Sequence, residues 1–176
     1  MKIVKIILIV LVSIIALPLI IALFIPKEYT VSNTETINKP ANEVFDYIKI
    51  IKNQEQYSVW VQQDPASVSY VGTDGTVGFI AKWDSKNENV GAGEQEITKI
   101  TNERYDVDLR FKRPFEDQAK AATFVKAISP NQTLVTTEFY GKGKWPMNLM
   151  SLIGKKILHD AQAQNLKNLK TILEKQ

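Results

Sequence analysis

The chain has 176 residues, of which 44% are hydrophobic, and it contains one histidine and no cysteine. This length suits one ordinary domain with its own core. The 22 basic and 19 acidic residues nearly balance, and the lack of cysteine excludes disulfides, a lipidated cysteine and cysteine-based metal or nucleophilic sites.

An uncharged apolar run, IILIVLVSIIALPLIIALFI, occupies residues 6–25. At about 1.5 Å per residue, such a helix crosses the roughly 30 Å hydrocarbon layer of a bilayer. The run exceeds the roughly 7–15 residues of a signal-peptide core, and no A-x-A-like cleavage site follows before Pro26. A retained transmembrane anchor is therefore favoured over a cleaved signal peptide.

The charges that flank this run predict its orientation. Lys2 and Lys5 precede it, whereas Lys27 and Glu28 cancel each other after it. By the positive-inside rule, the N-terminus lies in the cytoplasm and the rest is exported, as a single-pass protein of the cytoplasmic (inner) membrane. From Lys27 onward 20 basic and 19 acidic residues remain, which gives no electrostatic signal for nucleic acid. We expect an anchor, residues 1–26, and one domain, residues 27–176.

The domain opens with a predicted strand, YTVSNTETIN, at residues 29–38. Pro40 then suits a first helical turn, but the apolar pattern is lost before Tyr57 and Trp60, so residues 40–60 predict a short, interrupted helical segment.

Turn residues separate the predicted strands that follow. These strands are VSYVG, VGFIAKWD, GAGEQEITKI, RYDVDLRFKRP, AKAATFVKAI and TLVTTEFYGKG. In the fourth of them, Tyr105, Val107, Leu109 and Phe111 alternate with charged residues, which indicates an antiparallel sheet exposed to water on one face. Ser129 to Gln132 predict a hairpin loop between the last two strands.

The chain ends with a predicted amphipathic helix over residues 147–173. Met150, Ile153, Ile157 and Ala161 form a stripe that Leu166, Leu169 and Leu173 resume with a change of phase. Because the first half is apolar almost all round, we expect its N-terminal half to be buried and its C-terminal half to be wet. Gly154 indicates either a close packing contact or a weak point in the helix.

This order of elements resembles the START-related (SRPBCC) superfamily of polyketide cyclase/dehydrase-like proteins, from Tyr29 to Glu174. The resemblance rests on the order and spacing of several short motifs. They are TETINKPANEVFDYI, the aromatic pair in QYSVW, Asp64-Pro65, Gly75 and Gly78 before a strand ending in Trp83, Gly91-Ala-Gly93, FKRPF and LKNLKTILE.

The resemblance implies an α+β helix-grip fold. In that fold a curved antiparallel sheet of about seven strands wraps a long C-terminal helix, and two short helices after the first strand close one end of the groove. Residues 40–60 would form this closing piece, with Tyr57 and Trp60 either in the core or at a ligand entrance.

The sequence offers little catalytic chemistry. A single histidine excludes a histidine-based metal cluster, and no glycine-rich phosphate loop or cofactor motif is present. His159 adjoins Asp160, but adjacent helix positions point about 100° apart, so we expect a surface or groove-edge residue. Glu138 and Tyr140 are weak catalytic candidates, because Val135 and Phe139 are the better inward-facing residues of that strand.

Apolar and aromatic residues that could converge on one interior are the main functional signal. They are Trp60, Phe79, Trp83, Tyr105, Leu109, Phe111, Phe124, Phe139, Trp145, Met150 and Ile153. Such residues either fill a core or line a hollow one. We therefore expect an anchored domain that binds a lipid or another hydrophobic small molecule. The alternatives are a cyclase/dehydrase-type enzyme and an envelope protein-interaction module without a ligand; the sequence identifies no protein partner.

Overall fold

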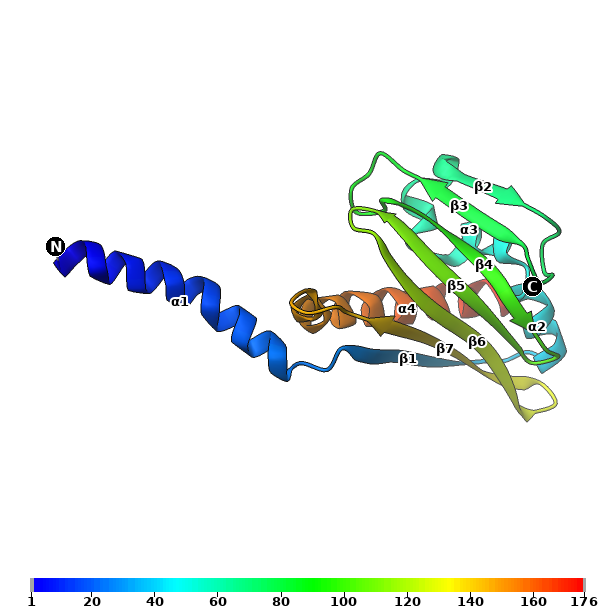
Figure 1. Ribbon diagram of the computed structural model, residues 1–176. Helices are drawn as coiled ribbons and strands as arrows, with labels where there is room; N and C mark the ends of the chain where they lie inside the picture. The colour runs from blue at the N-terminus through cyan, green and yellow to red at the C-terminus, as the bar shows by residue number, and fades with distance from the viewer. Residues whose placement is uncertain (1, 176) are drawn as a thin grey trace.

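The computed structural model describes residues 2–175 as one antiparallel sheet, a long helix packed on one face of it, and an N-terminal helix that projects away (Figure 1). The strands follow the sheet order β1-β7-β6-β5-β4-β3-β2, and every pair is antiparallel. Their bounds are β1 (Glu28–Ile37), β2 (Val68–Val71), β3 (Ile80–Asp84), β4 (Ala92–Ile100), β5 (Arg104–Arg113), β6 (Asp117–Ser129) and β7 (Gln132–Lys142). The expected α+β fold and seven strands are confirmed.

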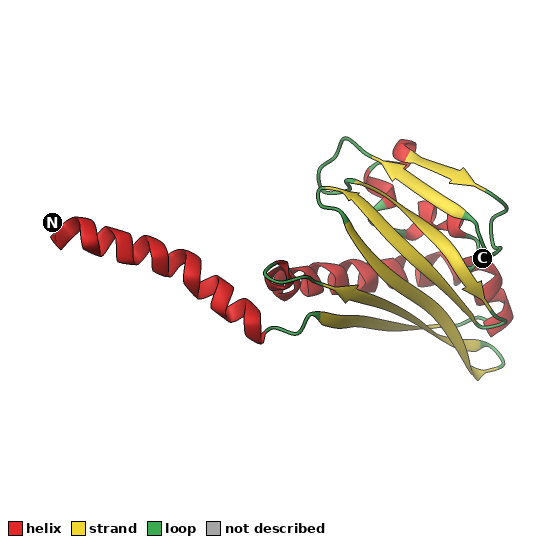
Figure 2. Ribbon diagram, viewed as in Figure 1, coloured by secondary structure: helices red, strands yellow, loops and turns green. Residues whose placement is uncertain are grey.

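The helices of the domain lie on one face of the sheet (Figure 2). They are α2 (Ala41–Ile48), α3 (Gln54–Tyr57) and α4 (Ser151–Leu173), together with the 3₁₀ turns η1 (Ile51–Asn53), η2 (Val61–Gln63), η3 (Pro65–Ser67) and η4 (Met147–Met150). The segment after β1 is interrupted, as the sequence predicts. Asp74 fixes its corner, because its two carboxylate oxygens accept hydrogen bonds from the amides of Ile51 and Lys52 at 2.8 and 2.9 Å.

The core lies where α2 and the C-terminal half of α4 meet the concave face of the sheet. Its fully buried members include Ile37, Val44, Ile48, Phe79, Val135 and Leu169. Burial of each such side chain contributes about 1.5–3 kcal/mol to folding. This core fixes the distal part of α4 against the sheet.

The outer face of the sheet is polar, as the alternation in β5 predicts. Tyr105 and Val107 are buried on the inner face. On the outer face, Arg110 binds Glu94 and Glu96, with nitrogen–oxygen distances of 2.7 Å to each carboxylate. The two faces therefore have separate roles, and only the inner one can line an apolar site.

The burial expected along α4 is wrong, because it runs in the opposite direction. In the first half Leu152 and Ile153 are 59% and 64% exposed, whereas Leu166 and Leu169 in the second half are 3% and 2% exposed. The second half packs in the core. The first half borders a cavity instead, so the side chains on its outer side have no neighbouring protein layer to pack against. The helix also starts later than expected, since residues 147–150 form the 3₁₀ turn η4.

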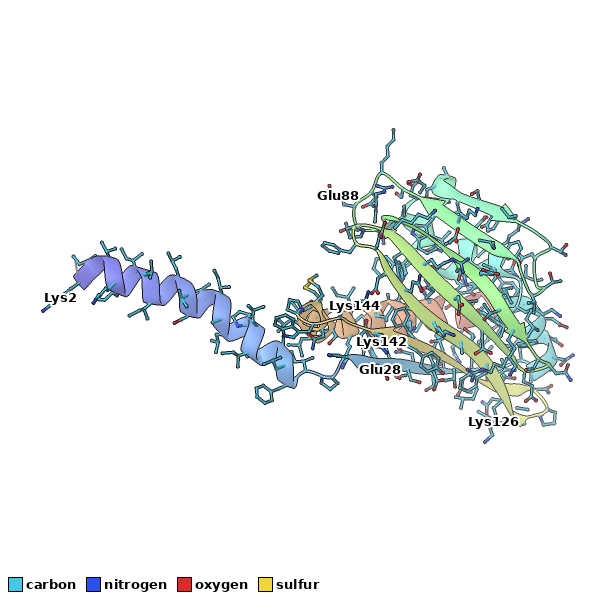
Figure 3. All side chains as sticks on the ribbon, viewed as in Figure 1. Lys2, Glu28, Glu88, Lys126, Lys142 and Lys144 are labelled. Carbon is cyan, nitrogen blue, oxygen red and sulfur yellow. The ribbon has the colours of Figure 1, made fainter. Side chains whose placement is uncertain are left out.

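Helix α1 (Lys2–Phe24) is apolar on all sides, with a mean hydropathy of 3.3 over its most apolar window. Only 6% of that window is buried, so the helix stands almost free of the domain. It leaves the domain at the end where α4 begins (Figure 1). We call this the proximal end; it carries Glu28, Glu88, Lys142 and Lys144, whereas Lys126 lies at the opposite end (Figure 3).

Candidate ligand-binding cavity

A cavity of about 490 Å³ lies between the inner face of the sheet and the first half of α4. This volume falls within the range of roughly 300–1,000 Å³ that is typical of small-molecule sites. The interior of the domain is therefore partly hollow, a property that composition and periodicity leave open.

Aromatic and aliphatic side chains from several strands form the sheet wall. Leu109 and Phe111 of β5 and Phe139 of β7 reach it because each lies at an inward position of its alternating strand. Trp83 of β3 packs edge-on against Phe111, with ring centroids 6.0 Å apart. This contact gives the wall a rigid aromatic corner.

The opposite wall is formed by α4 and by the segment between α3 and η2. Gly154, Ile157 and Leu158 line the cavity from α4. A Cβ built on Gly154 would meet nothing within 4 Å, so this glycine leaves the cavity open rather than admitting a close packing contact. Trp60 lines the cavity from the other segment, which α4 holds in place through the side-chain oxygen of Asn165, an acceptor for the amide of Val59 at 2.8 Å.

The cavity opens toward the proximal end of the domain. Four of its lining residues are exposed to solvent, namely Asn89, Arg113, Pro114 and Ile157. They come from the β3–β4 loop, the end of β5 with the β5–β6 connection after it, and the first half of α4. The mouth is therefore bounded by two loops and one helix.

A few polar groups interrupt the apolar lining. The side-chain nitrogen of Gln95 donates to the side-chain oxygen Oε1 of Gln54 at 2.7 Å. Within residues 2–175, the buried atoms Thr137 Oγ1 and Gln162 Oε1 have no hydrogen-bond partner. Both residues line the cavity, one from the sheet and one from α4. A buried polar atom without a partner costs about 1–3 kcal/mol. A bound molecule can remove this cost, because the Thr137 hydroxyl can donate or accept a hydrogen bond and Gln162 Oε1 can accept one.

Two tyrosines add further polar groups to the lining of the cavity. Burial raises the pKa of Tyr57 and of Tyr105, and both residues line the cavity. Their hydroxyl groups therefore keep their protons at neutral pH and can act as hydrogen-bond donors.

Six of the eleven residues predicted to bind a ligand line this cavity. They are Trp60, Trp83, Tyr105, Leu109, Phe111 and Phe139. The other five lie elsewhere. Phe79 is 1% exposed in the packed core, and Phe124 lies on the outer face under the guanidinium of Arg104, 5.2 Å from its ring centroid. Trp145, Met150 and Ile153 are exposed at the proximal end.

Glu138 and Tyr140, the weak catalytic candidates, are directed to the outer face. Glu138 borders the cavity wall, but its carboxylate accepts a hydrogen bond from the Tyr140 hydroxyl. Tyr140 in turn lies in a shallow hollow with Asp106 and Lys120. Burial, reinforced by Glu138, raises the pKa of Tyr140, which makes its hydroxyl a weaker acid. These two groups do not converge on the cavity.

Polar lining residues are the ones that sequence reasoning missed. Thr137 could have been found, because it shares the inward positions of β7 with Val135 and Phe139. Gln162 carried no comparable signal, since a glutamine on a helix is usually solvated. His159 is 56% exposed beside Asp160, and residues 2–175 hold no group of three side chains suited to a metal ion.

The geometry is that of a helix-grip protein with an open cavity. No family model and no curated protein matches the sequence. Solved structures do match the fold. Ara h 8.0201 has 15% sequence identity and a TM-score of 0.61, over 85% of this chain and 99% of its own.

Two more solved structures show the same likeness. Protein MLL2253 from Mesorhizobium loti has 13% identity and a TM-score of 0.61, over 84% of this chain and 98% of its own. Norcoclaurine synthase from Thalictrum flavum, in complex with dopamine and hydroxybenzaldehyde, has 10% identity and a TM-score of 0.63, over 84% and 87%. At these identities the likeness shows the fold alone, which is the α+β helix-grip fold that the sequence resemblance implies.

Proposed function

We propose that the protein is a membrane-anchored binding protein for a hydrophobic small molecule, which it holds in the cavity between the sheet and α4. The observation that carries this proposal is the cavity of about 490 Å³ with its aromatic sheet wall. A packed core would have been more stable, since close packing of side chains is the usual state of protein interiors. The retained hollow is a reason to assign a ligand. In the related fold of norcoclaurine synthase, the structure holds dopamine and hydroxybenzaldehyde.

The polar atoms of the cavity narrow the class of ligand. Thr137 Oγ1 and Gln162 Oε1 offer hydrogen bonds from opposite walls, while the surfaces around them are apolar. An amphipathic molecule with a mainly hydrocarbon or aromatic body and a hydroxyl, carbonyl or amide group would satisfy both features. Each square ångström of its apolar surface removed from water contributes about 25 cal/mol to binding.

The anchor is part of the proposal. A cleaved signal peptide would take with it the contacts that the domain makes to α1. Asn148 is 1% exposed, and its side-chain amide donates to the carbonyl oxygens of Ala22 at 2.7 Å and Ile25 at 2.9 Å. Loss of α1 would leave this buried amide without those acceptors. These contacts support a retained helix, with the domain outside the cytoplasmic membrane as the flanking lysines predict.

Photo-crosslinking in living cells tests the binding function directly. The photoreactive amino acid p-benzoylphenylalanine replaces Phe111 in the cavity wall of the full chain. The cells are irradiated, and the protein is then isolated from the membrane fraction and analysed by mass spectrometry. Phe124 is the matched control, because it is an aromatic residue of the same sheet on the outer face. We expect a small-molecule adduct at position 111 that is absent at position 124.

Two outcomes would overturn the assignment. One is that position 111 gives no adduct although the variant accumulates in the membrane at the wild-type level. The other is that both positions capture the same molecules to the same extent, which would indicate nonspecific contact. The adduct mass, where one forms, identifies the ligand class.

A further inference from the structure

An exposed apolar surface occupies the proximal end of the domain, and neither the cavity nor the core accounts for it. We call it the proximal patch; it consists of Trp145, Met147, Met150, Leu152, Ile153 and Ile157. Each of these side chains is 47–64% exposed. Together they span residues 145–157, from just before η4 into the first half of α4. A contiguous apolar surface of this kind marks a contact with another apolar phase.

The patch lies against the last turns of α1. The indole nitrogen of Trp145 donates to the carbonyl oxygen of Leu19 at 3.2 Å, and Asn148 reaches Ala22 and Ile25. Leu19 precedes the end of α1 at Phe24 by five residues, or about 7 Å along the helix axis. Trp145 therefore lies beside the helix, at a depth within the span rather than beyond its end.

Leu19 lies about 9 Å inside the outer end of the apolar run 6–25, whereas Asn148, which bonds Ala22 and Ile25, lies close to the boundary between the hydrocarbon and headgroup layers. The headgroup regions extend the roughly 30 Å hydrocarbon core to about 40–45 Å in total, so each adds several ångströms. Tryptophan is enriched at this boundary, where its ring is apolar and its N–H finds a polar partner. If α1 spans the membrane, the turn η4 is held near this boundary by its contacts to α1.

Charge supports the same partner along the chain segment that carries the patch. Between Glu138 and Asp160 the segment contains Lys142, Lys144, Lys155 and Lys156 and no acidic residue. Lys142 and Lys156 pair with Glu28 and Asp160, and Lys155 lies over the ring of Tyr29. Lys144 can extend its ammonium group from beside the apolar surface to a lipid phosphate. The two loops at this end carry both signs, among them Glu88, so apolar contact rather than net charge is the main attraction.

The mouth of the cavity adjoins the patch. Ile157 belongs to both, and Arg113 and Pro114 border the mouth from the β5–β6 connection. A surface that rests on lipid would therefore bring the opening of the cavity to the lipid.

We propose that the proximal patch docks on the outer leaflet of the bilayer that α1 spans, so that the cavity takes up its ligand from the membrane rather than from water. This inference rests on the proposed retained anchor and names the ligand class, a lipid or a lipid-dissolved molecule. The occupant of the patch is the lipid surface itself. Helix α1 and the patch then form two attachments to one bilayer, which fixes the orientation of the domain.

Spin-label accessibility tests this orientation on the full chain, because the absence of cysteine allows single labels without background. Leu152→Cys and Ile153→Cys carry the label in the patch, and Ile128→Cys is the control. Ile128 is 54% exposed near Lys126, at the distal end of the domain (Figure 3). Leu11→Cys, within α1, reports the anchor. The chains are placed in vesicles of phosphatidylcholine and phosphatidylglycerol, and collisions with oxygen and with a water-soluble nickel complex are measured.

We expect the labels at positions 152 and 153 to collide mainly with oxygen, as lipid-immersed labels do, and the label at 128 to collide mainly with nickel. Water-type accessibility at 152 and 153 together with lipid-type accessibility at 11 would overturn the docking and leave the anchor intact. Water-type accessibility at 11 would instead overturn the anchor and, with it, the docking.

A second variant links docking to uptake. Leu152→Glu with Ile153→Glu places two charges on the patch at positions that do not line the cavity. Combined with the photoreactive residue at 111, it should lower the yield of the small-molecule adduct several-fold while the chain stays in the membrane. An unchanged yield would show that the ligand enters from water and would contradict the proposal.

Discussion

Asn148 donates a hydrogen bond of 2.7 Å to the carbonyl oxygen of Ala22, which joins the domain to the last turn of the N-terminal helix across 126 positions of sequence. The same amide group reaches Ile25 at 2.9 Å, and a third contact, from the amide of Gly143 to the carbonyl oxygen of Lys27, lies next to it at 2.7 Å. The connection between α1 and β1 is thus a bonded junction rather than a free linker.

Asn148→Asp should open this junction, because it replaces a donor with an acceptor that faces two carbonyl oxygens. The cost of the unsatisfied buried groups is about 1–3 kcal/mol, which corresponds to a roughly 5–150-fold increase in the population of the open junction.

Trypsin cleavage after Lys27 reports this opening when reclosure is fast. We expect faster release of the domain from vesicles that hold the full-length variant. Asn131→Asp, the same change in the exposed β6–β7 hairpin, is the control. Cleavage of the Asn148 variant at the wild-type rate would show that the junction does not depend on this amide.

The two halves of α4 should differ strongly in how much stability a leucine-to-alanine substitution costs. Leu169→Ala empties a 2% exposed position in the core and should cost about 2–5 kcal/mol of unfolding free energy. Leu152→Ala removes a side chain that is 59% exposed and should change it by less than about 0.5 kcal/mol. Denaturant unfolding of the full chain in detergent micelles, followed by circular dichroism, compares the two. Equal losses would mean that the first half of α4 packs in the core after all.

This contrast shows where sequence reasoning reached its limit. The alternation in β5 correctly separates Val107 from the charged residues around it. In a sheet with one water-exposed face, the apolar residues of an alternating strand can face only the core. For a helix that is apolar all round, the sequence pattern does not determine which environment the side chains face. The pattern around Leu152 and Ile153 is the same whether the side chains face a protein core or an apolar surface outside the domain.

The cavity shows a second limit of the same kind. Phe79, just before β3, and Phe111 of β5 are both inward-facing aromatic residues, yet Phe79 is packed in the core and Phe111 borders a void. Whether a side chain touches neighbours or empty space depends on the distance between α4 and the sheet. That distance is a property of the whole assembly, so local periodicity does not contain it.

Gly154→Ala should stabilise the protein. A Cβ at this helical position meets nothing within 4 Å, and alanine is favoured over glycine inside a helix by about 0.5–1 kcal/mol. The unfolding midpoint of the full chain should rise accordingly. Gly93→Ala is the contrasting case, because its Cβ would lie 2.6 Å from the carbonyl oxygen of Arg110 and from the ring of Trp83. A loss of stability in the Gly154 variant would mean that α4 packs more tightly there than the structure shows.

The pH dependence of stability should contain a contribution from Glu94. Its hydrogen bond from Arg110 holds the pKa of the Glu94 carboxyl below its ordinary value of 4.5. A carboxyl whose folded-state pKa is lowered stabilises the fold above its unfolded-state value, and this contribution is lost as the pH falls through the folded-state value. Because both side chains are partly exposed, at 17% for Glu94 and 33% for Arg110, the contribution is at most about 1 kcal/mol. Glu94→Gln should therefore be less stable than the wild type at about pH 7, and this deficit should be smaller at about pH 3. Denaturant unfolding at both pH values measures the difference, with Glu103→Gln, an exposed turn residue, as the control. A deficit in the Glu94 variant that persists unchanged at acid pH would assign the effect to packing instead of to the ion pair.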